Sequence, residues 1–371
     1  MNFVLDDFIK EHEDWEAILT GAPYNLKVSR DGCYIMLKYS QIDSDFSEPM
    51  VQAARGVIYR EPEMVCVCRP FSKFFNYGEP NAASIDWDSE NLSILEKIDG
   101  SLIKVWYDQG EWHISTNGTI DAFKAPLSGA MEGSYGKLFM EAVKNHHFNF
   151  SAMPKNFTHL FELVSPWTRV VIPYEKLDAY YLSSFEPIYG WEDMMVDIFG
   201  KYFPVPARVE ASSIEELVAK AQALDWTHEG FVVWDGIDRI KVKSPAYVLA
   251  HYGRMNGNLS WESLVQVILD NEEDEFLTYA DEWSYQIFKI KEAAYNANVD
   301  VYCIIQFMGH YLDWSRAAYA QKVKEVCNKY GSMKYSDFMF KLYDNHELTW
   351  EDYTRDWNAA RWVKFLELKE Q

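Results

Sequence analysis

The chain has 371 residues, of which 48% are hydrophobic and 16% aromatic, so it holds enough apolar material for a large core and about two domains. Its formal net charge is −22, with 35 Lys and Arg against 57 Asp and Glu, which excludes a basic nucleic-acid-binding module of the usual kind. A polyanion would have to bind through a local cluster of cations within an otherwise repelling surface.

Disulfide-rich, zinc-binding and membrane-spanning proteins are also excluded. The five cysteines form no CxxC pair and no zinc-type Cys/His spacing, so we expect a reducing cytoplasm. The acidic, amphipathic start, MNFVLDDFIKEHEDW, predicts a surface helix rather than a signal peptide. The longest uncharged apolar run, residues 301–312, is shorter than the ~20 residues of a membrane span, so we expect a soluble protein without a membrane partner.

After this first helix, residues 33–243 are dominated by short β-type segments between turn residues. The predicted strands are CYIMLKY (33–39), GVIYR (56–60), MVCVCR (64–69), SILEKI (93–98), SLIKVWY (101–107), EWHIS (111–115), HLFELV (159–164), RVVIPY (169–174), AYYLSSF (179–185), GFVVWD (230–235) and RIKVK (239–243). Helical patterns interrupt them at residues 122–147 and after a capping box that begins at Ser213.

The β-type pattern stops after Ser244, and the remaining segments have helical periodicity. Ser260 caps a predicted helix, residues 281–319 form a long helical pattern with a break near Gly309, and Thr349 opens a last helix. The sequence therefore predicts an α+β protein, with antiparallel sheets and flanking helices in residues 1–246 and an all-helical domain in residues 247–371.

The segment EKIDGSLIKVWY, residues 96–107, has two interpretations. Asp99-Gly100 is a favoured pair for a two-residue turn, and apolar residues alternate on both sides, which is typical of a β-hairpin. Alternatively, K-x-D-G makes Lys97 a nucleophile. The motif is short, so its sequence context has to decide between the two.

Further short segments accompany this motif in a fixed order along the chain. They are ARG with Arg55, RPFSKFFN with Lys73, FELV with Glu162, EGFVV with Glu229, and IKVK with Lys241 and Lys243. This order resembles the covalent nucleotidyltransferase superfamily of polynucleotide ligases and RNA capping enzymes.

The similarity is greater to the ATP-dependent RNA ligase 1 family of T-even and related phages. RPFSKFFNYGEP, KIDGSL, FELVSPWTRVVIPY and the pair EGFVVW and IKVKSPAYV look like that family's motifs, and the chain length and helical last third agree with it. The resemblance implies an ATP-grasp-like nucleotidyltransferase domain, followed by a helical domain that provides specificity for RNA or tRNA.

The chemistry of that family gives a reason for the lysines. A lysine forms a phosphoramidate with AMP only as a neutral amine, a form that desolvation and neighbouring cations favour. Lys241 and Lys243 are two residues apart on a predicted strand, so both project to one face while Val242 faces the core. We expect this pair to hold the α-phosphate and stabilise charge on its oxygens while Lys97 attacks.

The remaining predicted site residues surround this centre. Asp99 can fix the loop or hold a metal-bound water, and Gly100 tolerates positive φ and close backbone approach. By resemblance, Glu162 reaches the ribose or metal-bound waters, and Glu229 orients waters on Mg²⁺. Burying a carboxylate on such an apolar strand costs free energy unless a cation or a donor is its partner, which independently supports a site. Asp99, Glu162 and Glu229 are thus the predicted metal residues, acting through waters.

Two cations and one substitution complete the prediction. Arg55 and Lys73 resemble the family's triphosphate-contacting cations, although either could be a solvated surface residue. The family usually carries a basic residue in the segment that aligns with residues 115–118, where this chain has Asn117. A phosphate contact at that position is therefore neutral or missing.

The resemblance implies an enzyme, an ATP-dependent RNA ligase acting in three steps. Lys97 takes AMP from ATP, the AMP passes to an RNA 5′-phosphate, and a 3′-hydroxyl displaces it. Mg²⁺ is the expected cofactor, and Mn²⁺ is a possible substitute for it. The expected partner is RNA with 5′-phosphate and 3′-hydroxyl ends, including a tRNA cut in the anticodon loop. We expect the protein to be a monomer.

Three alternatives remain. A DNA ligase or capping guanylyltransferase normally has a β-barrel after its last motif, which the helical pattern after Ser244 disfavours. A non-catalytic RNA-end or tRNA-binding protein on a ligase fold would not need Lys97 beside two other cations. The hypothesis that the chain is an acidic decoy of nucleic acid is supported by its negative charge alone.

Overall fold

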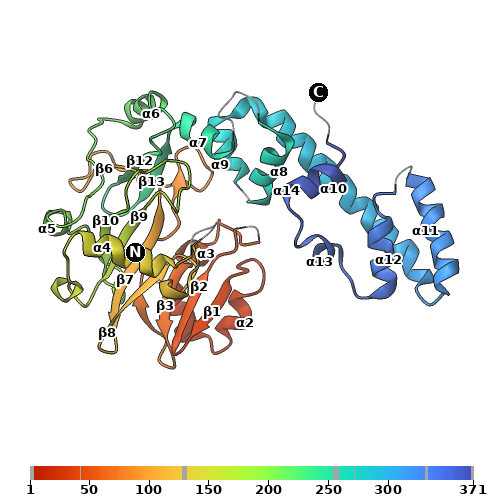
Figure 1. Ribbon diagram of the computed structural model, residues 1–371, viewed down its shortest axis with the longest axis horizontal. Helices are drawn as coiled ribbons and strands as arrows, with labels where there is room; N and C mark the ends of the chain where they lie inside the picture. Colours follow the sequence, from red (N-terminus) through yellow and green to blue (C-terminus); the bar gives the residue numbers. More distant parts are fainter. Residues whose placement is uncertain are drawn as a thin grey trace. The chain divides into compact units, whose positions relative to one another are not determined.

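The chain folds as two compact units, residues Met1–His251 and Tyr252–Gln371. The computed structural model describes residues 4–41, 43–127, 132–253, 259–270, 272–330 and 333–368 (Figure 1). The predicted boundary between residues 246 and 247 falls within helix α7 (Pro245–His251). Among the described residues, no helix combines the length and the apolar character that crossing a bilayer requires.

The described residues of the first unit form three sheets, in agreement with the predicted α+β class. One has the order β1 (Lys27–Asp31), β2 (Tyr34–Lys38), β3 (Arg55–Arg60), β4 (Val65–Cys68). The second has the order β11 (Glu192–Asp193), β10 (Asp178–Phe185), β9 (Thr158–Val164), β7 (Ser101–Asp108), β8 (Glu111–Thr116). The third has the order β5 (Phe75–Asn76), β13 (Arg239–Lys243), β12 (Gly230–Trp234), β6 (Ser93–Glu96). All pairs are antiparallel except the parallel pair of β13 and β5.

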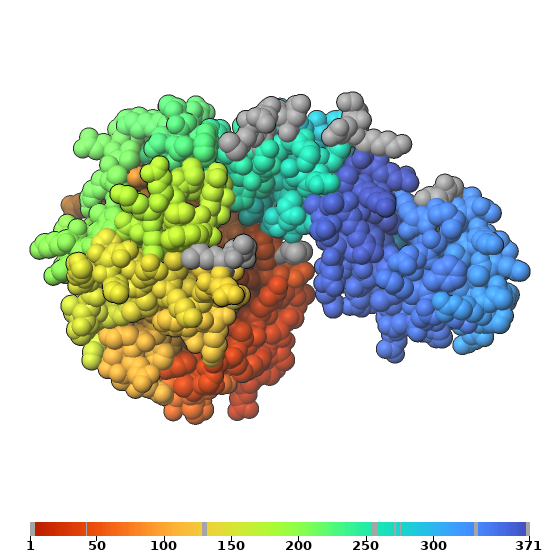
Figure 2. Space-filling view, viewed as in Figure 1, coloured from red at the N-terminus to blue at the C-terminus, as the bar shows by residue number. Residues whose placement is uncertain are grey.

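Short helices cover these sheets. In the first unit they are α1 (Val4–Glu11), α2 (Trp15–Leu19), α3 (Pro49–Ala53), the 3-10 turn η1 (Ala122–Lys124), α4 (Tyr135–Asn145), η2 (Phe150–Ala152), α5 (Val196–Phe199), α6 (Ile214–Gln222) and α7. The N-terminal helix is amphipathic as predicted, because Leu5 and Ile9 are buried. Lys124 of η1 forms an ion pair with Asp31 of β1. Figure 2 shows yellow and red segments of the first unit side by side.

The second unit is helical throughout its described residues. Its elements are α8 (Trp261–Leu269), α9 (Glu273–Tyr279), η3 (Asp281–Trp283), α10 (Ser284–Met308), η4 (Gly309–Tyr311), α11 (Arg316–Tyr330), α12 (Ser336–Asp344), α13 (Trp350–Thr354) and α14 (Ala359–Phe365). The predicted caps Ser213, Ser260 and Thr349 each accept a hydrogen bond from a backbone N–H of the first turn. The long helix ends at Met308, so the predicted break near Gly309 is confirmed.

The hairpin interpretation of Asp99-Gly100 is wrong. The strand before it, β6, pairs with β12, whereas the strand after it, β7, pairs with β8 and β9 in another sheet. Gly100 is not in the left-handed region, but a Cβ on it would lie 2.5 Å from the carbonyl oxygen of Leu163. Close backbone approach therefore requires glycine here, at the point where the chain crosses from one sheet to the other.

Two predicted elements differ from the structure. Residues 169–174 form a loop rather than a strand, because the backbone N–H groups of Val171 and Ile172 donate to the carboxylate of Asp99 rather than to a neighbouring strand. The helical pattern over 122–147 is split into η1 and α4, with residues 128–131 outside the described ones. Strands β1, β5 and β11 were not predicted, because they are short or polar.

A buried ion pair fixes α1 to the sheets. The guanidinium of Arg69 donates to both carboxylate oxygens of Asp6, at 2.9 and 2.7 Å, and to the carbonyl oxygen of Pro187 at 2.7 Å. Its backbone N–H donates to Thr158. This one side chain therefore joins α1, the end of β4 and the loop after β10.

Asp6→Asn is expected to lower the free energy of unfolding by about 3 kcal/mol, because it leaves a buried guanidinium without its counter-charge. Glu16→Gln, which removes the partner of Arg30 in an exposed pair, is the matched control and should cost less than about 1 kcal/mol. Urea unfolding followed by fluorescence measures both, and equal losses would contradict a structural role for the Asp6 pair.

Candidate active site

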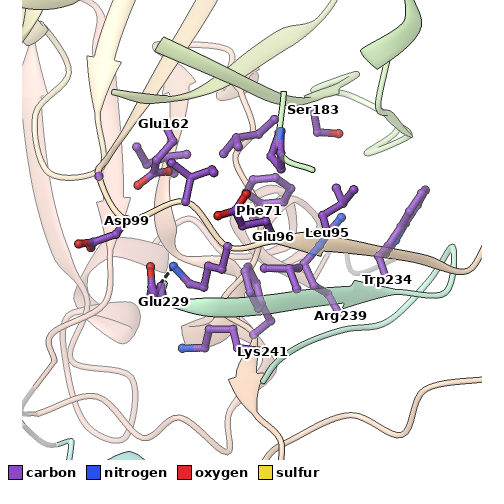
Figure 3. Close-up of a pocket in the computed structure, with 18 of the residues that line it drawn as sticks. Phe71, Leu95, Glu96, Asp99, Glu162, Ser183, Glu229, Trp234, Arg239 and Lys241 are labelled. Atoms are coloured by element: carbon purple, nitrogen blue, oxygen red, sulfur yellow. Dashed lines mark ion pairs between the residues drawn. The ribbon is translucent and has the colours of Figure 1, made fainter. Parts of the chain in front are cut away.

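One pocket of about 390 Å³ brings all the predicted site residues together. Among the residues that line it are Arg55, Lys73, Lys97, Asp99, Gly100, Glu162, Glu229, Lys241 and Lys243. They come from all three sheets, so the pocket lies where the sheets meet. The two ends differ: Figure 3 shows Asp99, Glu162 and Glu229 at one end and Trp234 and Arg239 at the other.

The third sheet aligns the segments that carry the lysines. Lys97 directly follows β6, Glu229 directly precedes β12, and Lys241 and Lys243 lie on β13. The backbone N–H of Lys97 donates to the carbonyl of Gly230 at 2.8 Å, so the motif is held by the strand that begins beside Glu229. Pairing between neighbouring strands thus assembles residues that are more than 130 positions apart in sequence.

Alternation on β13 directs its cations into the pocket. Ile240 and Val242 are each 2% exposed and pack in a core cluster with α6, whereas Lys241 and Lys243 line the pocket. The expected placement of Val242 in the core is confirmed. Arg239 lies on the same face of the strand and also lines the pocket.

Lys97 forms an ion pair inside the pocket. Its Nζ lies 2.8 Å from Oε1 of Glu229, and Nζ of Lys243 lies 3.5 Å from the same oxygen (Figure 3 marks ion pairs with dashed lines). Glu229 is 4% exposed, so this carboxylate is held between two lysines in a partly desolvated site. The sequence did not predict that Glu229 would contact Lys97 directly.

Asp99 is occupied by hydrogen bonds. Its Oδ2 accepts from the backbone N–H groups of Val171 and Ile172 at 3.0 and 2.8 Å, and its Oδ1 accepts from the hydroxyl of Tyr247 at 2.8 Å. Of the two roles suggested for Asp99, these contacts favour fixing the loop. The contacts of Tyr247 and the 171–172 loop with Asp99 were not predicted, although these residues lie in the segments IKVKSPAYV and FELVSPWTRVVIPY that resemble family motifs.

Glu162 has no such hydrogen-bond partner among the described residues. It is half-buried and faces the pocket, whereas every other residue of β9 is buried. Burial raises the pKa of Glu162 to about 7, and the neighbouring carboxylates of Glu229 and Asp99 add to the rise. The positive charges of Lys97 and Arg55 oppose it without cancelling it.

Two further polar atoms in the pocket have unused hydrogen-bonding capacity. Nη1 of Arg55 and Oε2 of Glu229 are buried and have no hydrogen-bond partner within the described part of the chain. The guanidinium of Arg55 lies over the ring of Phe74, 5.5 Å from its centroid. An anionic ligand accompanied by a donor or a cation would satisfy both the buried donor and the buried acceptor.

No three His, Cys, Asp or Glu side chains converge as a metal cage among the residues described. A divalent cation held here would need oxygen ligands from a bound phosphate and from water, which is how proteins usually bind Mg²⁺. Glu162, with its raised pKa, and Glu229, with one free oxygen, fit such a water-mediated role. Asp99 fits it less well, because both of its oxygens are used.

The other end of the pocket suits a flat aromatic group. The guanidinium of Arg239 lies 4.6 Å from the ring centroid of Phe71 and 5.5 Å from that of Trp234, and it pairs with Glu192 at 2.6 Å. Leu95 and Val232 also line the pocket. Alternation on RIKVK could have predicted Arg239 in the pocket, since it precedes Lys241 by two residues. The pocket therefore combines an aromatic and apolar surface with a region of charged side chains.

The predicted triphosphate cations differ in their surroundings. The ammonium of Lys73 lies 4.0 Å from the ring centroid of Phe46, and the Lys73 backbone N–H donates to Gln52. Both Lys73 and Arg55 line the pocket, which disfavours the alternative of solvated surface cations. Tyr39 and Phe74, two aromatic residues that could contact a base, also line it.

Residues 53–247 match the model of a protein family described as RNA ligase, and this segment contains every predicted site residue. The chain is 31% identical over 262 residues to a protein of Autographa californica nuclear polyhedrosis virus that has the provisional name bifunctional polynucleotide kinase/RNA ligase. It is 26% identical over 324 residues to an RNA ligase of Rhodothermus phage RM378, and 29% identical over 221 residues to RNA ligase 1 of bacteriophage TS2126.

These three matches cover different shares of the proteins compared. The match to the nuclear polyhedrosis virus protein covers 66% of this chain and 37% of that protein. The match to the Rhodothermus phage ligase covers 70% of this chain and 73% of that ligase. The match to the TS2126 ligase covers 56% of this chain and 54% of that ligase.

The raised pKa of Glu162 gives a test of the site without any ligand. Between pH 4.5 and about 7, Glu162 is protonated in the folded chain to a greater extent than in the unfolded chain. The free energy of unfolding therefore falls as the pH rises across this range and through about 7. Glu162→Gln cannot ionise and should escape this loss. The variant is expected to gain on the order of 2 kcal/mol over the wild type between pH 5 and pH 8.

Unfolding of both proteins at a series of pH values measures this difference. Glu216→Gln on the exposed start of α6 is the control and should run parallel to the wild type between pH 5 and pH 8, because its partners lower the pKa of Glu216 to about 2, below this range. Parallel curves for wild type and Glu162→Gln would show that Glu162 does not titrate in this range.

Proposed function

Because the chain belongs to the RNA ligase family of the T4 ligase 1 type, we propose that it is an ATP-dependent RNA ligase that joins a 5′-phosphate to a 3′-hydroxyl. The observation that carries the proposal is the ion pair of Lys97 and Glu229 inside a pocket lined by further cations. A lysine in that setting can serve as the nucleophile of a nucleotidyl transfer.

The first step forms a lysyl-AMP enzyme. Lys97 must lose its ammonium proton before its nitrogen attacks, and Oε1 of Glu229 lies 2.8 Å away in a position to accept it. The Nζ–P bond to the α-phosphate forms, the bond from that phosphorus to the bridging oxygen breaks, and pyrophosphate leaves. Lys243, which contacts the same carboxylate oxygen, keeps Glu229 oriented during the transfer.

The cations of the pocket stabilise the charge that moves in this step. Lys241 and Lys243 face the pocket from one strand, and Arg55 offers a buried N–H that has no partner within the described residues. Fixed positive groups in a partly desolvated site stabilise phosphate oxygens without the reorganisation that water requires. This is how a chain of net charge −22 would bind a triphosphate.

The carboxylates of the pocket fit a divalent cation. Glu162 and Glu229 would hold Mg²⁺ through water, and Asp99 would position the loop that carries Lys97. When bound, the ion supplies Lewis-acid neutralisation of phosphate charge, and Mn²⁺ can supply the same chemistry. Gly100 lets the loop pass close to β9, so that Glu162 and Lys97 share the pocket.

The later steps use the AMP as a leaving group. The RNA 5′-phosphate attacks the lysyl-AMP, giving an adenylylated RNA end and free Lys97. The 3′-hydroxyl of a second end then attacks that end, a phosphodiester forms and AMP leaves. The family resemblance supports RNA breaks, including tRNA cleaved in the anticodon loop, as the substrates, and the helical unit as their specificity domain.

Lys97→Ala is expected to lower the rate at which 5′-phosphate and 3′-hydroxyl RNA ends are joined with ATP by at least about 1,000-fold, because the nucleophile is lost. The same variant should still join RNA that carries AMP on its 5′ end beforehand, since that reaction does not need the lysine. Lys124→Ala, an exposed lysine on η1, is the control for charge.

Gel assays with RNA and matched DNA ends, and with ATP or GTP, complete the test. Joining by Lys97→Ala from ATP would contradict the mechanism. A wild-type protein that uses only GTP, or only DNA ends, would contradict the assignment as an ATP-dependent RNA ligase.

A further inference from the structure

Part of the pocket wall is built from two backbone segments that nearly touch. Gly56, near the start of β3, has φ +82°, and a Cβ on it would lie 2.6 Å from the carbonyl oxygen of Asn117. Arg55 and Asn117, one from each segment, line the pocket. Only glycine fits at position 56, so the two segments are held together at backbone level.

A buried lysine supports this wall from behind. Lys104 of β7 is 0% exposed, and its Nζ donates a hydrogen bond to the carbonyl oxygen of Gly56. Burial, together with the positive charges of Arg55 and Lys38, lowers the pKa of Lys104 to about 8. Near neutral pH it is therefore a cation placed directly under the backbone that carries Arg55.

A second lysine lies against the other segment. Lys38 at the end of β2 is the cross-strand partner of Arg55, and its Nζ lies 3.2 Å from the position that a Cβ on Gly118 would take. Lys38 is half-buried and has no ion-pair partner within the described residues. A cation held beside a neutral loop in an acidic protein is unusual without an anion to receive it.

The wall also carries unused hydrogen-bonding atoms. Nη1 of Arg55 and Oδ1 of Asn117 are both buried without a hydrogen-bond partner among the residues described. Rotation of the Asn117 amide would present its N–H donors in place of the oxygen. The wall thus offers a guanidinium and an amide to the pocket, with two ammonium groups close behind them.

We propose that Lys38 is a positioning residue for the β- and γ-phosphates of ATP, acting across the Asn117-Gly118 segment on a wall that Lys104 holds in place. The proposal rests on the function proposed above and goes further, because it assigns the charge at this wall to lysines on β2 and β7. The β- and γ-phosphates leave as pyrophosphate in the first step. Lys38 should therefore matter for that step and not for sealing.

Lys38→Met is expected to raise the KM for ATP in lysyl-AMP formation about 10-fold, with a smaller change in kcat, because one charged contribution to phosphate binding is lost. The KM for pyrophosphate in the reverse reaction should rise by a similar factor. Sealing of RNA that is adenylylated beforehand should stay within about twofold of wild type, since no β- or γ-phosphate takes part.

Two rescues and one control make the test specific. Lys38→Arg keeps the charge and should keep the wild-type KM. Asn117→Lys in the Lys38→Met background places a cation on the wall itself and should recover most of the loss. Lys124→Met, which removes an exposed lysine on η1, should leave all three reactions unchanged.

The outcomes separate this inference from the proposed function. An unchanged KM for ATP in Lys38→Met would overturn the role of Lys38. A parallel loss of sealing activity would also overturn it, because it would show that the substitution causes a structural defect. Failure of Asn117→Lys to recover the loss would show that the effect is not charge at this wall. A wild-type protein that forms no lysyl-AMP would instead overturn the proposed function.

Discussion

The ion pair between Lys97 and Glu229 is the contact around which the site is organised. Lys97 follows β6 and Glu229 precedes β12, so their 2.8 Å contact depends on the antiparallel pairing of these strands. The backbone bond from Lys97 N–H to the carbonyl of Gly230 fixes the register, and Lys243 on the next strand reaches the same carboxylate oxygen. A slip of one residue would turn each of these side chains to the opposite face.

The same arrangement explains how an acidic protein can offer a cationic pocket. Burying a charge is expensive unless an opposite charge or a donor compensates it. Glu229 is compensated by two lysines and Asp99 by two backbone N–H groups and Tyr247, whereas Glu162 and Arg55 remain partly uncompensated. The uncompensated groups are the ones that a nucleotide and its cation would satisfy, so the energetic cost of burying these groups would be offset on binding.

Much of this was predictable from local patterns and motif order. Alternation in RIKVK predicted which side chains leave the core, and the caps at Ser213, Ser260 and Thr349 marked helix starts. The loop at 169–174 was mistaken for a strand, because the partner of its N–H groups is Asp99, 72 residues away in sequence. Lys38 and Lys104 were missed for the same reason: each is an ordinary strand residue until the sheets bring it to Gly56 and Gly118.

The central claim is that Lys97 is the residue that becomes adenylylated, and mapping the modified residue tests it most directly. The purified protein, first stripped of bound AMP with pyrophosphate, is incubated with ATP and Mg²⁺, digested, and its peptides are sequenced by mass spectrometry. We expect AMP on the peptide that contains Lys97 and on no other lysine. AMP on Lys104, Lys241 or Lys243, or no AMP on a folded protein, would contradict it.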